Sequence, residues 1–174
     1  MEKLIAHARP ENVEGMRRYG ISGEKMLGVP MPVIRAIAKE LGKDQKQAED
    51  LWATGVHEAR ILASLLAVPK ETTRSLMDSW VEDFDSWDVC DQVCANLFCR
   101  TASAYDVVPA WTSREEQYVR RAGFVMIATL AVHDKRSRDE ALLRLHPAAD
   151  PQTVRDLVTG YRRYFLEVDP TPSV

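Results

Sequence analysis

The sequence predicts an all-α protein, and three observations favour that class. No run of residues alternates apolar and polar side chains, no Asn-Gly or Asp-Gly pair marks a hairpin, and β-branched clusters are few. Apolar residues at helical spacing instead follow the whole chain, with Gly and Pro between the segments. At 174 residues, the chain suits one domain with a sizeable core, so we expect a single domain over residues 1–174, irregular from about residue 168.

Proline and glycine mark where the expected helices begin and end. Pro10 opens the second helix, Gly42 closes the helix that begins near Pro32, and Gly55 and Pro69 flank a strongly apolar segment. The middle of the helix after residue 115 is almost wholly apolar, which is typical of a helix buried on most sides. The expected helices cover approximately residues 2–8, 10–19, 22–28, 32–42, 44–54, 56–68, 70–83, 86–101, 103–111, 115–133, 137–146 and 151–167.

These helices come as pairs joined by short breaks, and successive pairs begin roughly 35 to 40 residues apart, within the range of two-helix repeats. That rhythm predicts an α-α superhelix of HEAT- or armadillo-like repeats, whose concave surface is lined by the second helix of each pair. A compact irregular bundle would have the same helix count. The face that carries Trp87 and Asp91, and the face that carries Arg120 and Arg121, would then share one groove.

The segment from residue 86 to residue 98 holds the clearest functional signal. Ser86 is a good N-cap, and Trp87 and Asp91 are four residues apart, so their side chains lie on one helix face. Cys94 and Phe98 continue that face, which is otherwise apolar. A carboxylate there loses water, which is unfavourable unless the group is paired or used in chemistry. The structural alternative is that Trp87 packs in the core and Asp91 caps a neighbouring helix or pairs with an arginine such as Arg121.

The charge distribution is uneven. The net charge of −3 argues against a nucleic-acid partner, because domains that bind nucleic acid usually carry a basic excess. Residues 78–91, however, contain six acids and no basic residue, and without them 20 acids stand against 23 Lys and Arg. A locally basic face is therefore compatible with the sequence.

Several classes of protein find no support. The three cysteines form no CxxC pair, so they are expected to be small buried hydrophobes in a reducing compartment, which makes the cytoplasm the expected location. No apolar run reaches the ~18 residues of a membrane helix. His57 does not begin an HExxH motif, and the acids from Asp83 to Asp91 lack the glycine of a calcium loop and predict a solvated helix junction. We expect neither a metal nor a cofactor.

Four short motifs, in this order and spacing, resemble the AlkD-like DNA alkylation repair proteins, which are HEAT-like-repeat DNA glycosylases. The likeness spans roughly residues 12–135. The motifs are Met16-Arg17-Arg18-Tyr19, Leu27-Gly28-Val29-Pro30, Ser86-Trp87-Asp88-Val89-Cys90-Asp91 and Tyr118-Val119-Arg120-Arg121-Ala122.

The resemblance implies a role for each matching residue. The Trp-x-x-x-Asp pair of the family falls on Trp87 and Asp91, which makes these the expected catalytic residues. The family's groove arginine falls on Arg121, with Arg120 as the alternative, and its N-terminal aromatic residue falls on Tyr19. A second groove aromatic has no clear match, and Tyr161 is the nearest candidate.

The resemblance also implies a reaction and a partner. The family excises N3- or N7-alkylated purines, which are positively charged, from duplex DNA, and the protein would act as a monomer. Asp91 would stabilise an oxocarbenium-like sugar, as a glycosidase carboxylate does. Trp87 and Tyr19 would hold the cationic nucleotide by cation–π contacts, and Arg121 would bind a phosphate. Members of the family are thought to act without extruding the base.

Two other functions remain open. A homologue that binds DNA structures without catalysis is compatible with the acidic net charge and with a C-terminal end that looks shorter than in full family members. A HEAT-like scaffold for a protein partner would use the same groove as a peptide surface. Base release distinguishes the glycosylase from both alternatives, and salt-dependent DNA affinity distinguishes the second function from the third.

Overall fold

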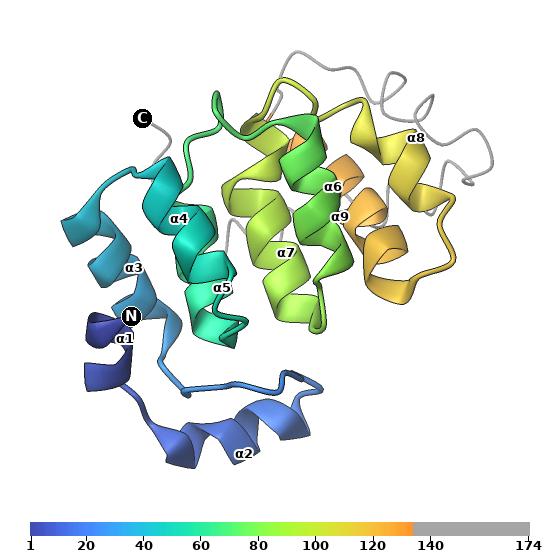
Figure 1. Ribbon diagram of the computed structural model, residues 1–174. Helices are drawn as coiled ribbons and strands as arrows, with labels where there is room; N and C mark the ends of the chain where they lie inside the picture. The colour runs from blue at the N-terminus through green and yellow to red at the C-terminus, as the bar shows by residue number, and fades with distance from the viewer. Residues whose placement is uncertain (134–174) are drawn as a thin grey trace.

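The structure is a computed structural model, and it describes residues 1–133. The predictions over residues 137–146 and 151–167, the tail and Tyr161 lie outside this part of the chain. The described part contains nine α-helices and one 3-10 helix (Figure 1): α1 Glu2–Ala6, α2 Pro10–Arg18, α3 Met31–Leu41, α4 Gln45–Trp52, α5 His57–Leu66, α6 Arg74–Glu82, α7 Trp87–Asn96, the 3-10 helix Phe98–Arg100, α8 Val107–Thr112 and α9 Gln117–His133.

The helices form two layers. In the inner layer, α3, α5, α7 and α9 pack against one another in succession (Figure 1). In the outer layer, α4 packs on α5, whereas α6 and α8 pack on α9. Within residues 1–133 there is no strand, and Lys25 and Val56 form an isolated bridge. The predicted all-α class is confirmed.

The inner helices recur at a shorter spacing than predicted. α5, α7 and α9 begin at His57, Trp87 and Gln117, which are 30 residues apart, rather than 35 to 40. The helices are short, since apart from α9 none of those described exceeds 11 residues, so a pair of helices with its connections takes up only 30 residues.

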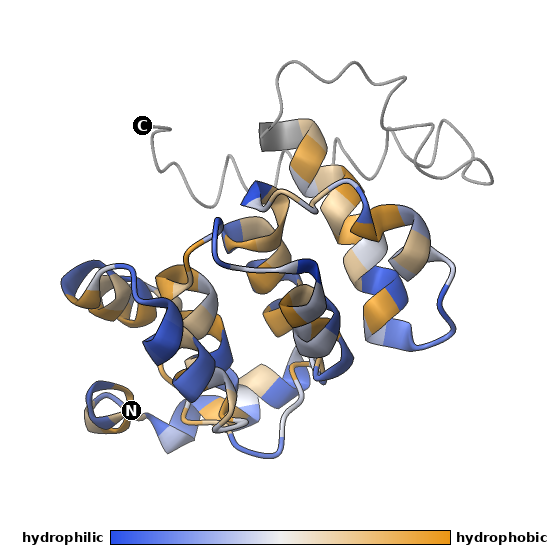
Figure 2. Cartoon of the chain, turned by 45° about the horizontal axis from the view of Figure 1, so that its top comes forward, coloured by the Kyte–Doolittle hydropathy of each residue, from blue (hydrophilic) through white to orange (hydrophobic). Residues whose placement is uncertain are grey.

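Hydrophobic segments gather where helices face one another (Figure 2), and the aromatic part of this core connects the outer helices α4, α6 and α8. Trp52 stacks on Trp80 with ring centroids 4.0 Å apart. The indole N–H of Trp52 donates to Asp83 at 2.8 Å, and that of Trp111 donates to Asp78 at 2.8 Å. These two carboxylates therefore accept hydrogen bonds that a buried indole requires.

Residues 22–28 contradict the predicted helix, because the segment between α2 and α3 is irregular. The backbone N–H groups at 27–29 donate to the carboxylate of Glu58, so they are satisfied without a helix. Gly28 has a φ of +73°, and a Cβ there would lie 2.0 Å from the carbonyl oxygen of Arg9. Only glycine fits this turn.

Other helix ends differ by a few residues. The hydroxyl of Thr73 accepts a hydrogen bond from the N–H of Leu76, so α6 begins after Thr73 instead of at residue 70. α7 ends at Asn96 and gives way to the 3-10 helix, and α8 begins at Val107 instead of residue 103. The three cysteines are buried and free, as predicted.

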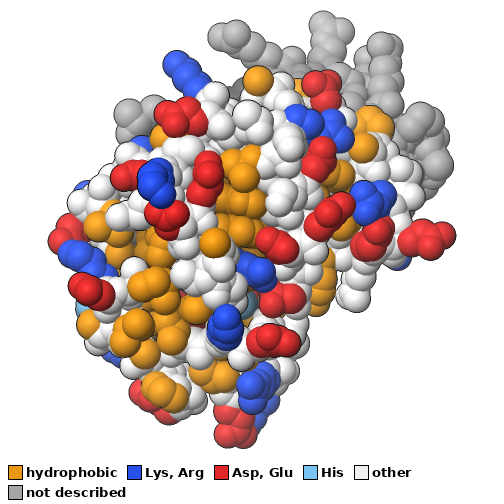
Figure 3. Space-filling view, viewed as in Figure 1, with side chains coloured by type: hydrophobic (Ala, Val, Ile, Leu, Met, Phe, Trp, Pro, Cys, Tyr) orange, Lys and Arg blue, Asp and Glu red, His pale blue; other side chains and the backbone are white. Residues whose placement is uncertain are grey.

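The surface carries both signs of charge. On the face seen in Figure 3, acidic and basic side chains are interspersed, and hydrophobic side chains gather at the lower left over the N-terminal helices. Among residues 1–133, no helix is both long and apolar enough to cross a membrane. No group of three His, Cys, Asp or Glu side chains in the same range is placed to hold a metal ion.

Candidate functional site

Asp91 on α7 and Arg121 on α9 form an ion pair with two hydrogen bonds. Nε and Nη2 of the guanidinium donate to Oδ1 and Oδ2 of the carboxylate, each at 2.8 Å. Asp91 is only 7% exposed, whereas the side chain of Arg121 is 39% exposed. The guanidinium carbon lies 5.9 Å from the centre of the Trp87 ring, within range of a cation–π contact.

Tyr19 joins this group through its backbone. The indole N–H of Trp87 donates to the carbonyl oxygen of Tyr19 at 3.2 Å, and the tyrosine side chain is 81% exposed. The structure thus brings Trp87, Asp91, Arg121 and Tyr19 to one place. Arg120, the alternative to Arg121, is exposed and is not the arginine that holds Asp91.

The geometry bears on both interpretations of Asp91, the structural ion pair and the functional carboxylate. The predicted pairing with Arg121 is present, and it supplies the structural reason for an acid on an apolar face. Trp87, however, is half-buried and does not belong to the core cluster. The indole of Trp87 and the side chain of Arg121 are thus partly exposed beside a buried carboxylate.

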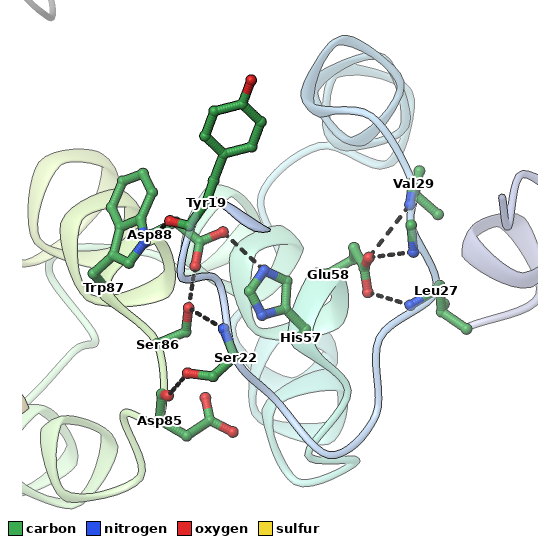
Figure 4. A network of polar contacts seen from close by, with 11 residues as sticks. Tyr19, Ser22, Leu27, Val29, His57, Glu58, Asp85, Ser86, Trp87 and Asp88 are labelled. Atoms are coloured by element: carbon green, nitrogen blue, oxygen red, sulfur yellow. Dashed lines mark hydrogen bonds and ion pairs between the residues drawn. The ribbon is translucent and has the colours of Figure 1, made fainter. Parts of the chain in front are cut away.

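A second polar network lies directly beside Trp87 (Figure 4). Nε2 of His57 contacts Oδ2 of Asp88 at 2.8 Å, and the Ser86 hydroxyl donates to Oδ1 of the same carboxylate. The Ser86 oxygen also accepts from the N–H of Ser22 at 3.3 Å. Ser86 is at the predicted N-cap position, but its side chain makes no capping hydrogen bond to α7. It connects α7 to the segment after α2 instead.

His57 and Asp88 each favour the charged form of the other. Burial lowers the pKa of His57, but the hydrogen bond and the negative charge of Asp88, with Glu58 and Asp85 nearby, outweigh burial and hold the pKa above its usual value. Burial raises the pKa of Asp88, but His57 and the Ser86 hydroxyl outweigh it and hold the pKa below its usual value. The interpretation of Asp88 as part of a solvated junction is wrong, because its side chain is 16% exposed and paired.

The pair should make stability depend on pH. Because the pKa of His57 is raised in the folded protein, its protonation contributes to the free energy of unfolding. This contribution is complete below pH 6.5, the usual pKa of histidine, and is lost as pH rises through the folded pKa. Because the pKa of Asp88 is lowered, its ionised form also stabilises the folded protein. This contribution is present above pH 3.8, the usual pKa of aspartate, and is lost as pH falls through the folded pKa. Urea unfolding of Asp88→Asn should therefore show a larger loss of unfolding free energy at about pH 5.5 than at about pH 8.5.

A matched control for this measurement is Asp50→Asn on α4. Asp50 pairs with Lys46 at 3.1 Å at the surface, where its side chain is 66% exposed. Loss of this surface ion pair should lower the free energy of unfolding by well under ~1 kcal/mol at either pH. If the loss caused by Asp88→Asn were the same at both pH values, the proposed charge on His57 would be excluded.

Glu58 makes a third set of contacts close by (Figure 4). Its carboxylate is 1% exposed and accepts the N–H groups of Leu27, Gly28 and Val29 at 2.9, 2.6 and 3.3 Å. In the sequence, His57 stands out only as a metal ligand that the motif excludes, and nothing there points to Glu58. The available signal was two adjacent polar residues at the start of a strongly apolar helix, where burial demands partners.

Comparison with known proteins decides the family. The family model described as DNA alkylation repair enzyme matches residues 1–151, which is most of the chain. The chain belongs to this DNA alkylation repair family. The match extends beyond residues 12–135, the span of the resemblance noted in the sequence, at both ends. No curated protein matches the chain.

One solved structure resembles this member of the DNA alkylation repair family over 95% of its chain, with a TM-score of 0.71 and 21% identity. The match covers 73% of that protein, which is described as belonging to "a new family of proteins related to the HEAT-like repeat DNA glycosylases with affinity for branched DNA structures". The likeness establishes the fold, so the predicted α-α superhelix of HEAT-like repeats is confirmed.

Proposed function

We propose that this protein binds duplex DNA and excises positively charged N3- or N7-alkylated purines from it. The observation that carries the proposal is the meeting of Trp87, Asp91 and Arg121 on two adjacent inner helices, with Tyr19 exposed beside them. An aromatic face, a carboxylate and a guanidinium are the three groups that a cationic nucleotide and its phosphate require.

Excision of such a base needs little protonation of the leaving group. An alkylated purine already carries a positive charge, so the bond between C1′ and the base breaks with its electron pair on the base, which leaves neutral. The positive charge moves to the sugar, and water adds to C1′ and loses a proton. The negative charge of Asp91 stabilises the sugar cation as it forms, which is electrostatic catalysis of the kind seen in glycosidases.

Arg121 positions both the carboxylate and the DNA in this proposal. Its Nε and Nη2 hold Asp91 in a fixed orientation, and its side chain is 39% exposed. A guanidinium has five N–H donors, so one arginine can contact a carboxylate and a phosphate together. Trp87 and Tyr19 would pack against the deoxyribose or the cationic base.

A second candidate is binding of branched DNA without excision. The observation in its favour is that Arg121 occupies both oxygens of Asp91, so the carboxylate is neutralised before any substrate arrives. The structural neighbour described above has affinity for branched DNA structures, which supports the same reading. This candidate predicts affinity for a four-way junction that falls linearly on a log–log plot against salt concentration, without base release.

Base release from duplex DNA that contains 7-methylguanine tests the proposal. We expect the protein to release the free base and leave an abasic site, whereas the same duplex without lesions should yield nothing. The same samples should be titrated against a four-way junction over a range of salt concentrations. Salt-dependent junction binding without base release would establish the second candidate, and the absence of both would leave the protein-scaffold function.

A further inference from the structure

Hydrogen bonds join the segment that follows α2 to the start of α7 (Figure 4). The indole N–H of Trp87 donates to the carbonyl oxygen of Tyr19 at 3.2 Å. The N–H of Ser22 donates to the Ser86 hydroxyl at 3.3 Å, and the Ser22 hydroxyl donates to the carbonyl oxygen of Asp85 at 2.6 Å. These contacts set the position of Tyr19 relative to Trp87, the two aromatic residues of the candidate site.

A glycine turns the chain toward α7 at the end of α2. Gly20 has a φ of +72°, in the left-handed region, and the N–H of Ile21 donates back to the carbonyl oxygen of Met16 at 3.1 Å. This is the Schellman arrangement by which many helices end at a glycine. The carbonyl group of Tyr19 and the backbone of Ser22 consequently both reach the start of α7.

His57 on α5 supports this junction from inside the protein. Its Nε2 contacts Oδ2 of Asp88 at 2.8 Å, and Oδ1 of Asp88 accepts from the Ser86 hydroxyl, whose oxygen in turn accepts from the N–H of Ser22. The His57 side chain is 1% exposed, and its Nδ1 has no hydrogen-bond partner within residues 1–133. A change in the protonation of the imidazole therefore acts first on Asp88 and then, through Ser86, on Ser22.

Most of the charged groups near the imidazole are acids. They are Glu11 of α2, Lys25 of the segment after α2, Glu58 of α5, Asp85 of the turn before α7 and Asp88 of α7. Asp88 is the one in contact, and with Glu58 and Asp85 it outweighs burial, so the pKa of His57 is above its usual value. When His57 loses its proton, its hydrogen bond to Asp88 is no longer charge-assisted at the donor and becomes weaker.

We propose that His57 is a positioning residue for DNA binding: through Asp88 and Ser86 it holds Tyr19 and Trp87 at the spacing that DNA requires, and it does so best when protonated. The proposal rests on the proposed function only in that DNA contacts these two aromatic residues, and it does not require excision. His57 itself is too buried to touch DNA. DNA affinity should fall about fivefold or more as pH rises through the folded pKa of His57, a coupling of ordinary size for two linked sites.

The indole signals of the free protein provide the first test. In a ¹H–¹⁵N spectrum, the Trp87 signal should titrate with the same midpoint as the ring signals of His57, because both report on the position of the junction. The signals of Trp52 and Trp111 are internal controls, because their N–H groups donate to Asp83 and Asp78 in the outer layer, and they should not follow that midpoint.

DNA affinity as a function of pH provides the second test. A fluorescent undamaged duplex and a four-way junction should be titrated between about pH 6 and about pH 8.5 at constant ionic strength, since salt alone changes DNA affinity. His57→Gln keeps an N–H donor but cannot titrate in this range, so its affinity should not depend on pH. His7→Gln, at an exposed position on α1, is the matched control and should keep the pH dependence of the unmodified protein.

Ser86→Ala separates positioning from a simple effect of charge. It removes the connection between Asp88 and Ser22 but keeps the ion pair with His57, and no helix cap is lost, because the Ser86 side chain makes no capping hydrogen bond. At about pH 6 its DNA affinity should be as low as that of the unmodified protein at about pH 8.5. Its free energy of unfolding should still depend on pH, because the ion pair remains.

Three results would each overturn the proposal: a Trp87 signal that does not follow His57, the same pH dependence of DNA affinity in His57→Gln and the unmodified protein, or full pH dependence in Ser86→Ala, which would assign the effect to charge alone. Base release with an affinity that does not depend on pH would also overturn it and retain the glycosylase. pH-dependent binding that His57→Gln abolishes, without base release, would retain the positioning role and remove the glycosylase. No DNA affinity at any pH would overturn both.

Discussion

Replacing Asp91 with asparagine is expected to slow release of 7-methylguanine from duplex DNA by about 100-fold or more, with little change in DNA affinity. Asparagine has nearly the same shape but no charge, so it cannot stabilise the cationic sugar. Asparagine still offers one oxygen as an acceptor to Arg121, whose side chain is 39% exposed, so the arginine should keep its place. Single-turnover kinetics of base release, with DNA affinity measured in parallel, check this expectation.

Asp106→Asn is the matched control, because Asp106 is exposed at the start of α8 and its side chain makes no capping hydrogen bond. It should leave both rate and affinity unchanged. Equal base release by Asp91→Asn and the unmodified protein would retain the activity and exclude Asp91 as its centre. A drop in DNA affinity equal to the drop in rate would assign Asp91 to binding, through its hold on Arg121, rather than to catalysis.

Replacing Glu58 with alanine is expected to lower the free energy of unfolding by about 3 kcal/mol or more. The substitution leaves three consecutive N–H groups at residues 27–29 without their acceptor, and two of these contacts are buried. The turn at Gly28 cannot form alternative helical hydrogen bonds, because its φ is +73°. Urea denaturation measures the loss.

Glu71→Ala, an exposed acid after α5, is the control and should change the unfolding free energy by no more than about 0.5 kcal/mol. Glu58→Gln should fall between the two, because one acceptor oxygen remains. If Glu58→Ala cost no more than Glu71→Ala, the contact between α5 and residues 27–29 would not hold this segment in place.

The sequence predicted most of the inner layer because its signals are local. Gly55 and Pro69 bound α5 within a few residues, and the spacing of Trp87 and Asp91 on α7 follows from helix geometry alone. The pairing of Asp91 with Arg121 was predictable as an alternative, since a buried carboxylate needs a cation or a use.

Predictions from the sequence were wrong where contacts with a residue far along the chain determine the local structure. Residues 22–28 have helical composition, but Glu58 on another helix satisfies the N–H groups that a helix would have used. The position of α2 was not predictable either, since hydrogen bonds from Arg9 to Leu27 and from Trp87 to Tyr19 connect it to distant parts of the chain. Neither effect leaves a pattern in neighbouring residues.

The 30-residue spacing of the inner helices has a consequence for how the chain assembles. The contacts between successive units join residues at nearly constant separation: 31 for Glu58 with Leu27, 31 for His57 with Asp88, and 30 for Arg121 with Asp91. Each contact therefore closes a loop of the same length and costs about the same chain entropy. Along the inner helices α3, α5, α7 and α9, cooperativity therefore passes from neighbour to neighbour, as in a one-dimensional Ising array, so folding of this layer can start at any unit and spread in both directions.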